Sequence, residues 1–201
     1  MKIAVFVSGN GTNLQALIDS VSKGTLKAEI ALVVSDKENA FALKRAKDAG
    51  IETFVIDRNK FDSRESFDKE ISKALDKRDI KGIILAGFMR ILSEYFVRKY
   101  KNKIINIHPS LLPLFKGTSA IKDAYDSGAK KTGVTIHFVD EKLDNGPIIL
   151  QETVEISKDD TKETLEEKIH KVEHKLYPKA IQLFVEGRLK IVEKKVKIEE
   201  E

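Results

Sequence analysis

Short apolar runs alternate along the chain with longer segments whose apolar residues recur every three or four positions, and this alternation limits the fold more than any other feature. Residues 3–7 are almost entirely apolar, as in a strand buried on both faces of a parallel sheet. Leu14, Leu17 and Ile18 then share one face of a helix. This alternation favours an α/β fold with a mostly parallel central sheet and helices on both of its faces.

The same patterns predict the remaining elements. Strands are expected over residues 28–34, 53–56, 82–86, 104–107, 133–139 and 148–154, with a terminal strand over 189–198. Helices are expected over residues 13–22, 40–49, 64–78, 93–100, 118–127 and 161–184, the last bent at Pro178. A soft division near residue 100 separates a nucleotide-fold-like half (1–100) from a half richer in polar loops (101–201). Because no linker interrupts the chain, we expect a single domain over 1–201.

The composition excludes several classes of protein. The chain has 36 Lys and Arg against 32 Asp and Glu, a net charge of +4, which is too balanced for a dedicated nucleic-acid binder. It contains no cysteine, so disulfides, thiol nucleophiles and thiolate metal sites are ruled out. No apolar stretch approaches the roughly 20 residues that span a bilayer, and the start lacks the features of a secretory signal. We therefore expect a cytoplasmic protein that binds neither membrane nor nucleic acid.

A glycine-rich turn, Ser-Gly-Asn-Gly-Thr-Asn over residues 8–13, follows the first predicted strand. Its exposed N–H groups and the dipole of the following helix favour an anion such as a phosphate. The turn lacks the third glycine of a dinucleotide-binding fingerprint, because Leu14 stands there, and it lacks the lysine of a P-loop. The alternative is an ordinary turn in which Thr12 or Asn13 caps the helix.

A polar pair lies at the end of the strand predicted over 104–107. Asn106 and His108 are two positions apart in an extended segment, so their side chains share one face. Ligand crevices form at such strand ends, where a His can act as acid or base and an Asn can donate to a developing oxyanion. We therefore expect catalysis here. The alternative is a pair that only satisfies backbone groups of the proline-rich loop that follows.

The sequence alone leaves the roles of Asp144 and His137 open between two interpretations. Asp144 lies in an acidic Asn-Gly-Pro turn, so it is either a turn residue or a carboxylate that orients a catalytic histidine. His137 lies in a strand on the same face as Thr135, where a core histidine and a functional one both fit. His170 and His174 are four positions apart on a helix but lack the metalloprotease arrangement, so we expect a solvated helix face.

Together these segments resemble the phosphoribosylglycinamide formyltransferase family, folate-dependent enzymes of purine synthesis. The resemblance covers nearly the whole chain and rests on residues 8–15, 61–65, 86–92, 106–113 and 134–147. The Asn-x-His-Pro-Ser-Leu-Leu-Pro segment is common to the folate-dependent formyltransferases of this fold. The Gly-Asn-Gly-Thr-Asn-Leu-Gln start and the short length point to the enzyme that acts on glycinamide ribonucleotide. The resemblance implies a Rossmann-like formyltransferase fold, with phosphate binding in the first half and catalytic residues in the second.

The resemblance also implies a role for particular residues. The implied catalytic residues are Asn106, His108 and Asp144. The implied contacts to the substrate phosphate and ribose are Gly11, Thr12, Asn13, Pro109, His170 and Glu173. The implied folate contacts are Arg64, Met89, Arg90, Ile91, Leu92, Asn106, Val139, Asp140 and Asp144.

The implied reaction transfers the formyl group of 10-formyltetrahydrofolate to the amine of glycinamide ribonucleotide. The products are formylglycinamide ribonucleotide and tetrahydrofolate, in the de novo synthesis of purines (IMP). The implied enzyme needs no metal and is a monomer or a homodimer.

One position departs from the family pattern. Several members carry a His two residues after an aromatic-Pro-Gly run, whereas this chain has Phe-Lys-Gly-Thr-Ser, which puts Ser119 there. The help of that His is then dispensable or supplied by water. Methionyl-tRNA formyltransferase and formyltetrahydrofolate deformylase carry an extra domain, for which 201 residues leave no room. The alternatives are another folate-dependent formyltransferase or hydrolase of this fold, and a non-catalytic sugar-phosphate-binding module.

Overall fold

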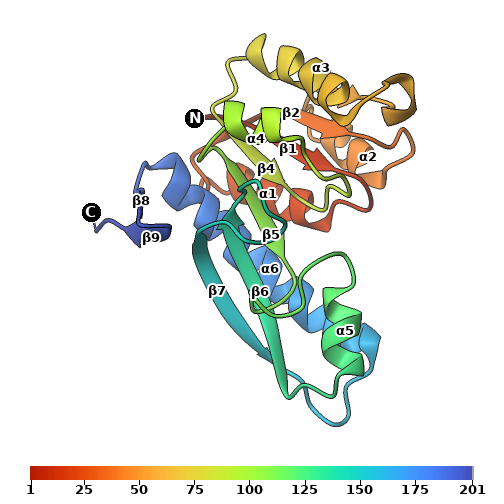
Figure 1. Cartoon of the computed structure of the whole chain (residues 1–201), viewed down its shortest axis with the longest axis vertical. Helices are drawn as coiled ribbons and strands as arrows, with labels where there is room; N and C mark the ends of the chain where they lie inside the picture. The colour runs from red at the N-terminus through yellow and green to blue at the C-terminus, as the bar shows by residue number, and fades with distance from the viewer. Residues whose placement is uncertain (201) are drawn as a thin grey trace. The chain divides into compact units, whose positions relative to one another are not determined.

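The computed structural model describes residues 1–200. The chain divides into two compact units, Met1–Ile105 and Asn106–Glu201, which we call the N-terminal and C-terminal units. Figure 1 gives the path of the chain and the labels used below.

The N-terminal unit contains a parallel sheet. Its strands are β1 (Lys2–Val7), β2 (Glu29–Ser35), β3 (Thr53–Val55) and β4 (Gly82–Leu85). Its helices are α1 (Thr12–Ser22), α2 (Phe41–Asp48), α3 (Arg64–Asp76) and α4 (Glu94–Lys99), with one 3-10 turn, η1 (Arg58–Lys60). Strand β1 pairs in parallel with β2 and β4, and β2 pairs in parallel with β3. A further strand, β5 (Ile104–His108), begins here and ends in the C-terminal unit.

The order of these strands creates a binding edge. The chain runs outward from β1 to β2 and β3 and then returns to β4 on the other side of β1. Right-handed crossovers therefore place α1 and α2 on one face and α3 and α4 on the other, and α1 packs on α2 and α3 on α4. The segments that leave β1 and β4 consequently start side by side, at the kind of reversal point where α/β sheets bind ligands.

The hydrophobic core of this unit includes all of β1 after Lys2 and packs against the segment that follows β4. Ile3, Phe6 and the other residues over 3–7 are 0% exposed, as expected of a strand buried on both faces. The ring of Phe6 packs edge-on against Phe88, with centroids 5.3 Å apart, and against Phe96 of α4 at 6.1 Å. The segment that follows β4 therefore begins on the hydrophobic core.

The C-terminal unit is built around a β-hairpin. Its elements are α5 (Ala120–Asp126), β6 (Lys131–Phe138), β7 (Ile148–Glu155), α6 (Lys162–Val185), β8 (Leu189–Val192) and β9 (Lys195–Ile198). Strands β6 and β7 pair antiparallel, which confirms the pairing that the sequence predicts. Helix α6 packs along both strands, and α5 packs on α6 (Figure 1).

The single terminal strand predicted over 189–198 is wrong. The structure has two short strands there, β8 and β9, paired antiparallel. Glu193 and Lys194 join them with φ angles of 49° and 64°. Two successive left-handed residues form the tight turn that suits a hairpin. Because this turn lacks the usual Asn-Gly or Asp-Gly signal, the sequence pattern runs through it without a visible break.

The strand order is β3-β2-β1-β4-β5-β6-β7, a mixed, mostly parallel seven-stranded sheet, with β8 and β9 apart from it. The α/β class expected from the sequence is thus confirmed. Within the described part of the chain, no helix is long and apolar enough to cross a membrane.

Candidate active site

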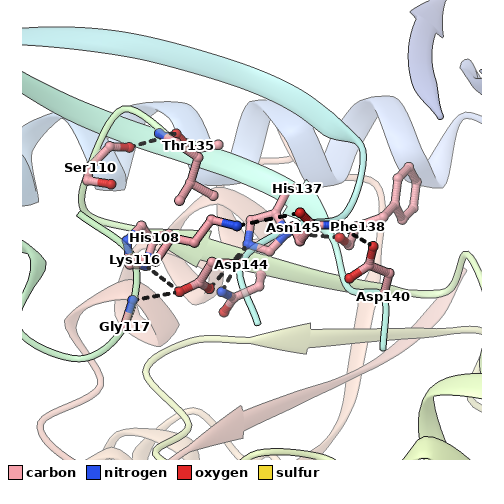
Figure 2. Close-up of polar contacts among 12 residues, drawn as sticks. His108, Ser110, Lys116, Gly117, Thr135, His137, Phe138, Asp140, Asp144 and Asn145 are labelled. Atoms are coloured by element: carbon pink, nitrogen blue, oxygen red, sulfur yellow. Dashed lines mark hydrogen bonds and ion pairs between the residues drawn. The ribbon is translucent and has the colours of Figure 1, made fainter. Parts of the chain in front are cut away.

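Four polar side chains of the C-terminal unit form one cluster at the end of β5 and beside the loop that joins β6 to β7, and Figure 2 labels His108, His137 and Asp144 among them. They are Asn106, His108, His137 and Asp144. The two histidines and Asp144 are buried, and Asn106 is half-buried. The three residues that the sequence puts forward as catalytic thus lie together, with His137 as a fourth member.

The two ring nitrogens of His108 face different groups. Its Nε2 lies 2.8 Å from the backbone oxygen of Phe115, and because a carbonyl only accepts, Nε2 carries the proton and donates. Its Nδ1 lies 3.6 Å from Oδ2 of Asp144, which is longer than a hydrogen bond. Nε2 therefore anchors the ring to the backbone, and Nδ1 faces the carboxylate across a gap.

His137 orients the amide of Asn106. Its Nδ1 lies 2.8 Å from the oxygen of Phe138 and must donate, so the neutral ring accepts at Nε2. Nδ2 of Asn106 lies 3.2 Å from that Nε2 and donates to it. Burial lowers the pKa of His137 below its ordinary value of 6.5, which favours this neutral form, although the charge of Asp144 acts in the opposite direction. His137 thereby fixes which end of the Asn106 amide points to it.

Asp144 is held in the cluster by its backbone and by one hydrogen bond. Its φ angle is 47°, a left-handed conformation that costs free energy in a residue other than glycine. Its Oδ2 accepts from the N–H of Gly117 at 2.9 Å, and its Oδ1 lies 3.8 Å from Nε2 of His137. Figure 2 shows the carboxylate directed at both imidazole rings. The left-handed backbone at residue 144 therefore places the carboxylate in the cluster. Its Oδ1 stays beyond hydrogen-bond distance of the His137 ring.

The loop after His108 is fastened to the hairpin. The Oγ1 of Thr135 donates to the oxygen of Ser110 at 2.6 Å and accepts from the N–H of Leu112 at 3.1 Å. Nε2 of Gln151 donates to the same Oγ1 at 2.7 Å. These buried contacts hold the backbone that supplies the partners of His108 and Asp144.

The loop between β6 and β7 is closed on itself. The carboxylate of Asp140 accepts from a backbone N–H of its own loop at 2.9 Å and from Nδ2 of Asn145 at 3.1 Å. At Gly146 a Cβ atom would lie 1.8 Å from the oxygen of Phe138, so only glycine fits. Asp140 and the half-buried Val139, both predicted folate contacts, thus belong to a loop of fixed shape.

The predicted nucleotide contacts of this unit lie on two elements. Pro109 directly follows β5 and is half-buried. His170 and Glu173 lie on α6, where the ring of His170 stacks on His174 with centroids 6.1 Å apart, so the histidine pair is only half-exposed. Glu173 is buried. Burial, and after it the charge of Glu173, raises the pKa of Tyr177 well above its ordinary value.

In the N-terminal unit, the glycine turn opens α1. Gly11, and neither Thr12 nor Asn13, is the N-cap residue of the helix; its φ is 75° and it makes no side-chain capping hydrogen bond. The alternative in which Thr12 or Asn13 caps it is therefore wrong. Thr12 and Asn13 form its first turn, where N–H groups lack intrahelical partners. Helix α1 thus begins with donors suited to an anion.

Helix α2 packs against the same turn and donates hydrogen bonds to it. A Cβ at Gly11 would lie 2.5 Å from Cβ of Ala42, and the N–H of Ala42 donates to the oxygen of Gly9 at 3.1 Å. Arg45 donates from Nε to the oxygen of Asn10 at 2.9 Å and from Nη2 to its Oδ1 at 3.0 Å. An open hollow of about 540 Å³ lies over this turn, lined by Ser8, Gly9, Asn10, Asn39, Ala40, Phe41 and Arg45.

The segment after β4 presents apolar side chains to solvent. Met89 and Ile91 are 64% and 59% exposed, whereas Leu92 is buried. Between them, Nε of Arg90 donates to the buried carboxylate of Asp36 at 2.7 Å. Arg64, the remaining predicted folate contact, is exposed at the start of α3. Four of these five predicted contacts are thus exposed, and one of them, Arg90, directs its Nε to Asp36.

Sequence reasoning did not single out Asp36, Arg45 or the supporting role of Thr135, and it left His137 open. The signal for His137 was present in the sequence. Thr135 and His137 are two positions apart in a strand and share one face, just as Asn106 and His108 do. For Asp36 the signal was its place two residues after the strand predicted over 28–34. Among residues 1–200 no group of three His, Asp or Glu side chains could hold a metal ion.

The chain is similar to known formyltransferases over nearly its whole length. The family model described as formyl transferase matches residues 1–181. The phosphoribosylglycinamide formyltransferase of Escherichia coli is 42% identical over 193 residues, covering 96% of this chain and 91% of that protein. The crystal structure of glycinamide ribonucleotide transformylase 1 from Symbiobacterium toebii superposes with a TM-score of 0.97 and 41% identity, covering 100% of this chain and 94% of that one.

Longer proteins contain a similar sequence as one part of their length. The trifunctional purine biosynthetic protein adenosine-3 of Gallus gallus is 49% identical over 193 residues, which cover 96% of this chain but 19% of that protein. The chain thus spans about a fifth of the length of this trifunctional relative. The fold, the family model and the full-length relatives agree, and the chain belongs to the phosphoribosylglycinamide formyltransferases (EC 2.1.2.2), the family that formylates glycinamide ribonucleotide in de novo purine biosynthesis with 10-formyltetrahydrofolate as co-substrate.

Proposed function

We propose that this chain transfers the formyl group of 10-formyltetrahydrofolate to the amine of glycinamide ribonucleotide. The observation that carries the proposal is the cluster of Asn106 with the buried His108 and Asp144, because a module that only binds a sugar phosphate has no use for it. The distance of 3.6 Å between His108 and Asp144 is short enough for one bridging atom to touch both.

The reaction needs three events that these groups can serve. The amine nitrogen of the ribonucleotide attacks the formyl carbon, and the carbonyl oxygen gains a negative charge. The bond from that carbon to N10 of the folate then breaks, and a proton passes from the attacking nitrogen to N10. In this proposal Asn106 and His108 donate to the developing oxyanion, and loss of one such donor typically costs about 2.7–4 kcal/mol of barrier.

In this proposal Nδ1, and not Nε2, is the nitrogen of His108 that takes part in the reaction. Nε2 already donates to the backbone oxygen of Phe115, whereas Nδ1 faces a gap. In this proposal a proton on Nδ1 serves the reacting atoms from within that gap, and the carboxylate of Asp144 on its other side stabilises the charged ring. His137 holds Nδ2 of Asn106, whose second hydrogen stays available to the same oxygen.

The binding roles extend the proposal to residues outside the cluster. The substrate phosphate binds the N–H groups of Gly11, Thr12 and Asn13, and its ribose side involves Pro109, His170 and Glu173. The folate is held by Arg64, the 89–92 segment and the 139–144 loop, with Asn106 in reach of its formyl group. The support is local: the backbone N–H groups of the first turn of α1, directly after Gly11, and the exposed Met89 and Ile91.

The deciding experiment is a formyl-transfer assay with the purified chain, glycinamide ribonucleotide and 10-formyltetrahydrofolate. Formylated ribonucleotide with a matching amount of tetrahydrofolate supports the proposal. Formate release without a formylated product would instead identify a hydrolase. Phosphate-dependent binding without turnover would leave a sugar-phosphate-binding module.

Further properties belong to the same proposal. The two units act as one formyltransferase domain, as a monomer or homodimer in the cytoplasm, without nucleic acid or membrane. The reaction uses no metal, so dialysis against EDTA should leave the turnover number unchanged. Sedimentation of the active protein decides between monomer and dimer.

A further inference from the structure

The segment that follows β4 is fastened at two adjacent residues to a single buried carboxylate. Asp36 stands directly after β2, and its side chain is 0% exposed. Its Oδ2 accepts from Nε of Arg90 at 2.7 Å, and its Oδ1 accepts from Oγ of Ser8 at 2.5 Å. The same Oγ accepts from the backbone N–H of Met89 at 2.8 Å. Ser8, Asp36 and Arg90 thus form a relay across the ends of β1, β2 and β4 within the N-terminal unit.

The relay controls which side chains the segment exposes. Arg90 turns its guanidinium toward Asp36, and its neighbours Met89 and Ile91 are 64% and 59% exposed. A buried carboxylate is stable only when it is paired and hydrogen-bonded, so the relay is costly to break. The segment therefore has one favoured arrangement, with two apolar side chains directed to solvent.

Beyond Ser8, which belongs to both, the glycine turn has contacts that do not involve this relay. Helix α2 holds it independently, through the N–H of Ala42 and the guanidinium of Arg45. By contrast, Met89 and Arg90 reach the rest of the unit through Ser8 and Asp36. The relay therefore fixes the segment after β4 and, within the turn, contacts only Ser8.

We propose that Asp36 is a positioning residue for folate binding, acting through Arg90 and, with Ser8, through the backbone of Met89. This inference rests on the proposed function, since it assumes that the segment over 89–92 contacts the folate. Asp36 itself touches neither substrate. It sets the shape of an apolar surface against which a flat aromatic ligand can pack.

Two variants cut the relay at different places. Asp36→Asn keeps an oxygen for Ser8 but can set an amide N–H against Nε of Arg90, so the Arg90 contact is lost. Ser8→Ala releases the N–H of Met89 and leaves the ion pair in place. Glu52→Gln is the matched control, because Glu52 pairs with Arg78 through a similar carboxylate–guanidinium contact next to the amino end of β3.

The experiment measures both Michaelis constants, the turnover number and equilibrium binding of unreactive folic acid. Asp36→Asn should raise the folate Michaelis constant and the folic acid dissociation constant about tenfold, as for loss of a charged hydrogen bond. Ser8→Ala should raise the same two constants by a smaller factor, and Glu52→Gln should change them less than about twofold. In an Arg90→Gln background, Asp36→Asn should add less than about twofold if both residues act through one contact.

The outcomes separate this inference from the proposed function. If the wild-type chain transfers formyl groups but Asp36→Asn and Ser8→Ala raise the nucleotide constant, or raise both constants equally, the inference is overturned. If Asp36→Asn does not fold, Ser8→Ala decides alone, because it removes no buried charge. A wild-type chain that binds folic acid without turnover refutes the proposed function and leaves the binding test of the inference valid.

Discussion

The two units use polar groups in opposite ways. In the C-terminal unit the candidate catalytic residues His108 and Asp144 are themselves buried, at 4% and 9% exposure, and Asn106 is half-buried. In the N-terminal unit the candidate binding residues other than Leu92 are exposed or half-exposed, as at Met89 and Gly11, and a buried polar group, Asp36, supports the segment after β4. The difference teaches that chemistry needs groups removed from water, where charge interactions are stronger, whereas binding needs accessible groups on a stiff support.

Removal of His108 should have the largest effect and acts on the C-terminal unit alone. His108→Ala removes an acid–base group and should lower the turnover number about 100- to 10,000-fold. Both Michaelis constants should change little, since the binding groups stay in place. Steady-state kinetics, with thermal unfolding to verify the fold, checks this. A turnover number near that of the wild type would remove His108 from the mechanism.

Two further substitutions sharpen the assignment of Nδ1. The amide of Asn places a donor near the position of Nδ1, whereas the longer Gln places one near Nε2. His108→Asn should therefore retain more activity than His108→Gln. The reverse order would mean that Nε2 leaves the oxygen of Phe115 and performs the reaction.

Asp144→Asn should have the next largest effect. It removes the charge that would stabilise a protonated His108, and we expect a loss of turnover of about 10- to 100-fold. The carboxylate also opposes the lowering of the pKa of His137 by burial, so this pKa should fall further in the variant. NMR titration of the His137 ring measures the direction. A raised pKa would contradict the geometry of the cluster.

Gly11→Val tests the N-terminal side of the comparison. The new side chain meets Ala42 and disturbs the donors of α1, so the nucleotide Michaelis constant should rise about tenfold or more. The folate constant and the fold should be preserved. Gly24→Val is the matched control, because Gly24 also has a positive φ, of 71°, but no atom lies within 4 Å of its added Cβ. A larger change in the folate constant would reassign the turn to the other substrate.

Arg45→Ala should act on the same constant more weakly. It removes hydrogen bonds to Asn10 but no donor of the helix itself, so we expect an increase in the nucleotide constant of about threefold to tenfold. Lys44→Ala, which breaks an exposed pair with Asp48 on the same helix, is the control. If the two variants behave alike, the hydrogen bonds from α2 to the turn are not needed for binding.

The smallest effect concerns stability and pH. Because burial lowers the pKa of His137 in the folded chain, the unfolded chain binds the proton first as the pH falls below 6.5. The free energy of unfolding should then decrease with falling pH, by at most about 1.4 kcal/mol per pH unit for this group, until the folded pKa is reached. His137→Gln should reduce this slope in urea unfolding. An unchanged slope would mean that other groups carry it.

The sequence alone determined the class of fold and the main residues of the cluster. The apolar runs predicted the strands, because a parallel strand buried on both faces has to be apolar throughout. Asn106 and His108 could be paired because a strand repeats its direction every two residues. The hairpin of β8 and β9 escaped prediction, since its turn uses Glu193 and Lys194 and carries no sequence signal of its own.

The tertiary structure alone decided how the polar groups are used. The proximity of Asp144 to His108 depends on a left-handed backbone at residue 144 and on the N–H of Gly117, neither of which has a periodic pattern. The function of His137 likewise depends on a hydrogen bond to a residue 31 positions away. The pairing of Asp36 with Arg90 joins the ends of strands that are separated by two helices in the sequence. The local sequence pattern predicts how each segment folds. Such long-range contacts form only when the strands pair side by side in the folded chain.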